Sequence, residues 1–156
     1  MNRKVESVWI YLVEVVAAAF LLFALNLLCG KQQLFDWKDH HQAELTNLLL
    51  GSVAATGITF AAFFAVLTTD FGLALRRAGE AKFYSVAFGF PLLLFFMTFV
   101  GLTFGNSEWG WVYNELIVFL LIYSGINIVT MVKNVTGLVG LWQDVDRARR
   151  DDKRPN

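Results

Sequence analysis

Four long apolar segments constrain this chain more than any other feature of its sequence. They cover about residues 7–28, 46–69, 83–105 and 111–131. Each has ~20 residues or more, enough to cross a hydrocarbon core of ~30 Å at a rise of ~1.5 Å per residue. The 156 residues are 56% hydrophobic and only 17% charged, whereas soluble domains carry about a quarter charged residues. The sequence therefore predicts an all-α integral membrane protein with four transmembrane helices.

The connections between the four segments are short, at residues 29–45, 70–82 and 106–110. Helices with short connections pack beside one another in alternating directions. We therefore expect an antiparallel four-helix bundle over residues 1–132. Residues 133–156 are expected to form a second unit, a cytoplasmic amphipathic helix with a charged tail.

The basic residues predict the orientation in the membrane. Of the 13 lysine and arginine residues, all except Lys31 and Lys38 lie before the first segment, between the second and third, or after the fourth. Loops rich in lysine and arginine remain in the cytoplasm. Both termini are thus expected on the cytoplasmic side of the cell inner membrane.

Small residues mark the second segment as a packing helix. They occur four residues apart in two rows: Gly51 and Ala55, then Gly57, Ala61 and Ala65. Such rows let helix backbones approach closely inside a bilayer, where packing and hydrogen bonds drive association. They are typical of packing within a bundle, and also of motifs that join two copies.

The fourth segment continues beyond the expected membrane boundary as an apolar stripe. Its residues follow in steps of three and four: Met131, Val135, Leu138, Trp142 and Val145. This spacing predicts one helix from about residue 111 to 149, with the stripe on one face. The stripe either lies on the membrane surface or packs against other copies or a partner helix.

Acids and bases alternate in the tail that follows, where Arg147, Arg149 and Arg150 supply most of the positive charge. Such a tail is typical of a solvated helix end. It is also a possible docking surface for a cytoplasmic partner protein or for anionic lipid.

One acidic residue, Glu14, lies well inside the first segment. Ionisable residues inside a membrane are costly and are functional candidates by default. Asn127 is expected at a similar depth in the fourth segment with Ser124 one turn away, and Thr68 and Thr69 reach that level from the second. We therefore expect one of two roles for Glu14. It either binds a proton or cation, or it is a protonated acid whose hydrogen bond holds two helices together.

A second acid, Glu115, lies near the outer boundary of the fourth segment, where Asn26 and Asn114 are also expected. Its carboxylate is close enough to the headgroups to extend into them. If the helices surround a pore, Glu115 and Glu14 would form rings of negative charge that favour cations.

The sequence offers little for enzyme chemistry. His40 and His41 are the two histidines, and neighbouring side chains point apart, so one metal ion would not readily bind both. We find no phosphate-binding glycine loop, catalytic triad or CxxC motif. We therefore expect no catalytic residue, cofactor, metal ion or nucleic-acid partner.

The stretch Tyr11-Leu12-Val13-Glu14-Val15-Val16 resembles the first helix of small multidrug-resistance antiporters, which have four spans and an essential membrane glutamate. The resemblance covers about six residues and implies transport coupled to Glu14. The chain departs from that family in its longer loops, its cytoplasmic helix and the lack of a glycine motif in the third segment. We assign no family from it.

Most distinctive features of the sequence are packing surfaces rather than reactive groups. The leading hypothesis is a non-enzymatic, homo-oligomeric inner-membrane component of a multi-part system, such as a defence or stress effector, that engages a cytoplasmic partner. The alternatives are a small proton- or cation-coupled transporter or channel using Glu14, an immunity protein against a pore-forming toxin, and an accessory subunit of a larger membrane complex.

Overall fold

The computed structural model describes the backbone of residues 3–105 and 110–152, and the side chains of residues 11–105, 110–148 and 150. Throughout these ranges the chain forms α-helices joined by short turns, without a β-strand. The helices are α1 (Arg3–Cys29), α2 (Lys31–His40), α3 (Gln42–Val66), α4 (Asp70–Arg77), α5 (Glu80–Phe104) and α6 (Trp111–Asp152).

Four of these helices are long and apolar enough to cross a membrane. The apolar stretches are Tyr11–Cys29, Gln42–Val66, Glu80–Phe104 and Trp111–Ala148. The first three agree closely with the predicted segments, because continuous apolar character over 19 residues or more is easily recognised in a sequence. The fourth begins where predicted but continues to Ala148 rather than ending near residue 131. The chain thus has the helices of a multi-pass membrane protein.

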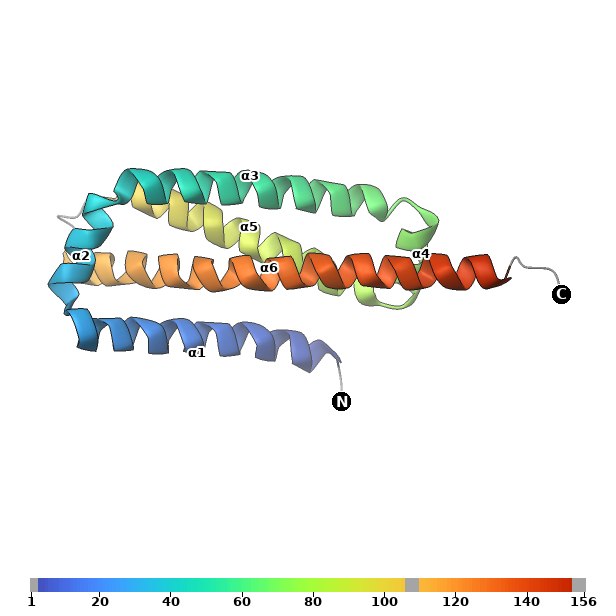
Figure 1. The fold of residues 1–156 in the computed structure, drawn as a ribbon, viewed down its shortest axis with the longest axis horizontal. Helices are drawn as coiled ribbons and strands as arrows, with labels where there is room; N and C mark the ends of the chain where they lie inside the picture. The colour runs from blue at the N-terminus through green and yellow to red at the C-terminus, as the bar shows by residue number, and fades with distance from the viewer. Residues whose placement is uncertain (1–2, 106–109, 153–156) are drawn as a thin grey trace.

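The long helices lie along the length of the molecule, with α6 beside α1, α3 and α5 (Figure 1). Helix α3 packs on α5, α5 packs on α6, and α1 packs chiefly on α6. The start of α1 and the end of α6 lie toward the same end of the molecule (Figure 1). Helix α1 is therefore a peripheral helix that depends mainly on one neighbour.

The largest buried cluster joins α3, α4 and α5 at the end of the molecule where α4 lies. Its buried members are Phe63, Leu67, Phe71, Leu75 and Phe88. Three residues of the predicted stripe on α6, Met131, Val135 and Leu138, pack against this cluster. Part of the stripe is therefore used for packing within one chain.

Two short helices, α2 and α4, occupy connections for which we predicted no secondary structure. Helix α4 is capped at its start by Thr69, whose hydroxyl accepts a hydrogen bond from the backbone N–H of Gly72 at 3.3 Å. Its Phe71 and Leu75 are four residues apart, so both reach the buried cluster from one face. Helix α2 crosses between α1 and α3 at the opposite end of the molecule (Figure 1).

The buried face of α3 is not made by the five predicted small residues. The buried side chains of α3 are Leu49, Thr56 and Phe63, spaced seven residues apart, whereas Gly51, Ala55, Ala61 and Ala65 are exposed. Gly57 is half-buried, and a Cβ there would lie 3.9 Å from Leu92 of α5. Large side chains thus fill this interface, and contact between copies through the exposed small residues stays a prediction.

Candidate functional site

Glu14 is buried between α1 and α6, with 7% of its surface exposed. Its Oε1 accepts a hydrogen bond from the Thr130 hydroxyl at 2.5 Å. Its second oxygen, Oε2, has no hydrogen-bond partner among the described residues. No described lysine or arginine forms an ion pair with it either. One oxygen of this carboxyl group is thus hydrogen-bonded and the other is not, within an apolar stretch long enough to span a membrane.

Asn127 lies one turn before Thr130 on α6 and is completely buried. Its amide nitrogen donates to the Tyr123 carbonyl at 3.0 Å, while its Oδ1 is unpaired within the described structure. Oxygen atoms therefore dominate this buried site.

The other residues predicted to join Glu14 have different partners. Ser124 is buried and shares a hydrogen bond of 3.2 Å with Thr98 of α5. Thr68 and Thr69 are exposed at the end of α3 and donate to backbone carbonyls of that helix. Sequence reasoning missed Thr130, although its position three residues after Asn127 places it on the same side of α6.

The second predicted acid, Glu115, is neutralised. Its Oε1 lies 2.6 Å from the Lys31 ammonium and accepts a hydrogen bond from the Asn26 amide at 3.2 Å. The Lys31 ammonium also lies 5.1 Å from the centre of the Trp111 ring. An ion pair with lysine opposes the ring of free negative charge that we considered for a pore.

Lys38 of α2 is a charged residue that sequence reasoning did not single out, and only 4% of its surface is exposed. Its ammonium donates to Asn114 Oδ1 at 2.7 Å and lies 2.8 Å from the Asp39 carboxylate. Nearby, the Gln42 side chain donates to the Leu102 carbonyl at 2.7 Å. These bonds fasten α2 and the start of α3 onto α5 and α6.

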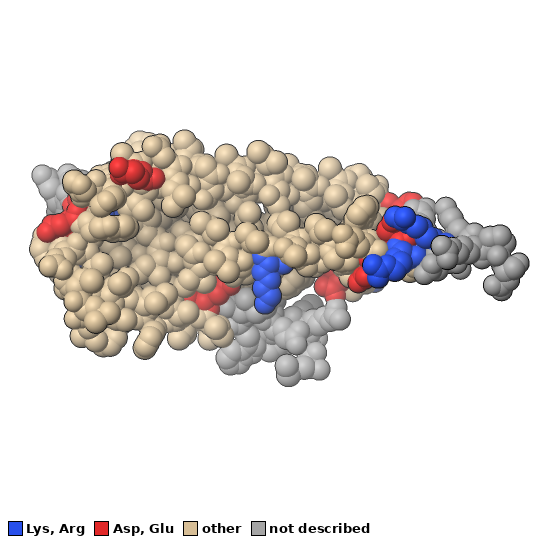
Figure 2. Space-filling model, in the orientation of Figure 1, with Lys and Arg blue, Asp and Glu red and all other residues tan. Residues whose placement is uncertain are grey.

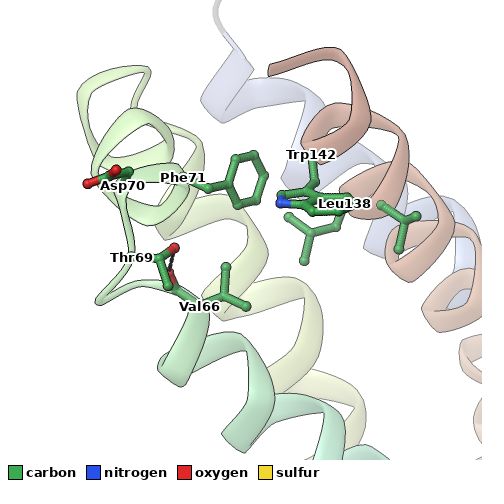
Figure 3. A pocket seen from close by; sticks show the side chains of 7 residues that line it. Val66, Thr69, Asp70, Phe71, Leu138 and Trp142 are labelled. Atoms are coloured by element: carbon green, nitrogen blue, oxygen red, sulfur yellow. Dashed lines mark hydrogen bonds between the residues drawn. The ribbon is translucent and has the colours of Figure 1, made fainter. Parts of the chain in front are cut away.

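A pocket of about 440 Å³ lies between the α3–α4 turn and α6. Figure 3 shows the Phe71 ring facing Trp142 across it, with Leu138 beside them and Asp70 pointing away. Trp142 is 51% exposed and also lines two smaller hollows that continue along α6 to Arg150. We call this continuous surface, from Val66 to Arg150, the Trp142 groove.

The end of α6 mixes both signs of charge (Figure 2). Arg147 lies 3.9 Å from Asp144, and Arg150 forms an ion pair with Asp146 that raises the pKa of Arg150 above its usual value. The Arg149 side chain lies outside the described residues. The described charged side chains of this end are thus paired along the helix, which is typical of a solvated helix surface.

No protein-family model, curated protein or solved structure matches this chain. The site must therefore be interpreted from its own chemistry. Among the described side chains, those of residues 11–105, 110–148 and 150, no group of three or more His, Cys, Asp or Glu lies close enough to hold a metal ion. The Trp142 groove and the half-satisfied Glu14 are two described features with capacity for further contacts.

Proposed function

We propose that this chain is a non-enzymatic, oligomeric protein of the cell inner membrane whose α6 end engages a cytoplasmic partner. In this proposal the four spans form an antiparallel bundle with both termini in the cytoplasm. The positions of the basic residues support that orientation. The shared end of the molecule reached by the start of α1 and the end of α6 agrees with it (Figure 1).

The observation that carries the proposal is the exposure of Trp142 in a groove whose end near Val66 and Phe71 is largely apolar. Tryptophan is enriched in the central contacts of protein interfaces because it supplies a large contact area. Val139 and Val145 are also exposed on this part of α6. Met131 and Val135 pack inside the chain, so Trp142 and Val145 are the residues of the stripe most available to another molecule.

The experiment is site-specific photocrosslinking in membranes of cells that produce the protein. A photoreactive amino acid replaces Trp142 in one variant and Ala148 in the control, since Ala148 is exposed on the same helix but does not line the groove. We expect adducts from position 142 and few from position 148. An adduct at twice the chain mass identifies a second copy, and another mass identifies a partner. Equal adduct yields at the two positions contradict the proposal.

A second candidate function is a proton- or cation-coupled process at Glu14. The unpaired Glu14 Oε2 and Asn127 Oδ1 favour it, because buried polar oxygens without partners are costly and a proton or cation would satisfy them. Liposome flux driven by a pH or sodium gradient tests it. Flux should be lost in Glu14→Gln and retained in Glu115→Gln, whose carboxylate is already paired with Lys31. Identical flux in wild type and Glu14→Gln removes this candidate.

A further inference from the structure

A second cavity, of about 250 Å³, opens between α1, α3 and α6 and is closed at one end by α2. We call it the α1–α3 crevice. Leu25 supplies its α1 wall, Leu48 and Ser52 its α3 wall, and Gly125 lies on its α6 floor. It exists because α1 packs chiefly on α6 rather than on α3 (Figure 1).

The lining of the crevice matches a hydrocarbon. Leucine, valine and isoleucine side chains make most of it, and no charged residue is among those that line it. Its two serines are already bonded: Ser52 donates to the Leu48 carbonyl at 2.9 Å, and Ser124 shares its hydrogen bond with Thr98. The described walls thus offer no free side-chain hydroxyl to a polar ligand, and water is not retained in apolar cavities.

The crevice lies at the depth of the spanning helices. Its α1, α3 and α6 residues all fall within the apolar stretches of those helices. At its edge Leu48 and Ile128 are exposed, so the crevice is continuous with the surface that faces lipid. In a bilayer the apolar molecules in contact with such a surface are lipid chains.

Two side chains suited to the headgroup region, Trp37 and Lys31, belong to α2, the helix that closes one end of the crevice. Trp37 lines the crevice and is half-exposed, and aromatic rings of this kind prefer the headgroup level. On the same helix Lys31 is 53% exposed, with its ammonium beside Glu115 and Trp111. A molecule with an apolar chain in the crevice and a charged headgroup over α2 therefore fits both ends.

We propose that the α1–α3 crevice binds one acyl chain of a membrane phospholipid, with the headgroup over α2. The acyl chain supplies the packing contact that α1 and α3 do not make with each other. The phospholipid is thus a structural ligand of the bundle, independent of the Trp142 groove.

Native mass spectrometry of the detergent-purified protein tests the proposal. Wild type should retain one phospholipid per chain. Gly125→Leu should reduce that occupancy at least tenfold, because the leucine side chain projects into open space on the crevice floor. Gly51→Leu is the matched control: a Cβ there also meets open space, but Gly51 does not line the crevice. It should retain the lipid as wild type does.

A second pair of variants covers a failure of Gly125→Leu to fold. Ser52→Leu fills the crevice from α3, and Thr59→Leu is its control, because both hydroxyls bond the carbonyl four residues earlier on that helix. Circular dichroism checks that each variant is helical. Equal phospholipid retention in the filled variants and their controls overturns the proposal. Retention of only a free fatty acid or quinone, or a lipid-free dimer in which a second copy covers the crevice, also overturns it.

Discussion

The bond between Lys38 and Asn114 should hold α2 onto α6. Lys38 is almost fully buried, and its ammonium donates to Asn114 Oδ1 at 2.7 Å. Hydrogen bonds to charged groups contribute about 1.5–3 kcal/mol. Because Asp39 also contacts the ammonium, we take the lower part of that range. Asn114→Leu should therefore reduce the free energy of unfolding by about 1.5–2 kcal/mol.

Thermal unfolding in detergent, followed by tryptophan fluorescence, measures this effect. At about 2–4 °C per kcal/mol for a chain of this size, Asn114→Leu should lower the Tm by about 3–8 °C. Lys38→Met should cost about 1–2 kcal/mol, because it leaves the Asn114 oxygen without its cation. The double variant should cost less than the sum of the two single variants by about 1 kcal/mol, since neither group is then left without its partner.

The matched control is Lys31→Met, which removes the half-exposed partner of Glu115. Exposed ion pairs contribute about 0–1 kcal/mol, so this change should be small. If the Lys38 and Asn114 effects add within about 0.5 kcal/mol, the two side chains are not coupled. The account of α2 as a helix fastened by buried polar bonds is then refuted.

Three further changes test the packing. Phe88→Ala should reduce the free energy of unfolding by about 3–5 kcal/mol, because it empties a buried site. Phe96→Ala, at a half-exposed position, is its control and should change the free energy of unfolding by about 1 kcal/mol or less. If the two variants unfold at similar denaturant concentrations, the assigned core is contradicted. Gly72→Ala should cost about 1–3 kcal/mol, because its Cβ would lie 2.4 Å from backbone atoms of Val66 and Leu67. An unchanged Tm argues against this close approach. Thr130→Val should cost about 0.5–1.5 kcal/mol by removing the hydrogen bond to Glu14. Thr136 is the control, because its exposed hydroxyl bonds a carbonyl of its own helix, and Thr136→Val should cost less than Thr130→Val. A larger loss of stability in Thr136→Val than in Thr130→Val contradicts the Glu14 contact.

The number of long apolar helices and their approximate positions could be predicted because each is a long apolar stretch. The packing faces could not, because nearly every face of α3 is apolar and a bilayer does not distinguish one from another. Gly51 and Ala55 indicated a smooth face, but large residues such as Phe63 fill the real contact. A periodic pattern identifies a buried face only where the other face is in water.

The same reasoning explains the site. Glu14 was visible from sequence because a carboxylate in an apolar segment is rare. Its partner Thr130 was not, because threonine is common in membrane helices and carries no comparable signal. The sequence places Lys38 only as one of two basic residues on the side of the membrane opposite the cytoplasm. Lys38 is buried because this connection folds as α2, and the short polar sequence of the connection did not predict a helix.

The length of α6 has a mechanical consequence. Its 42 residues form one helix about 63 Å long, and neither proline of the chain, Pro91 or Pro155, lies within it. Asn114 is tied near one end by α2, and Trp142 lies 28 residues further on, about 42 Å away. A tilt of ~10° about Asn114 therefore swings Trp142 by ~7 Å. Because the helix is continuous over this length, a small angular change near Asn114 becomes a large displacement at Trp142.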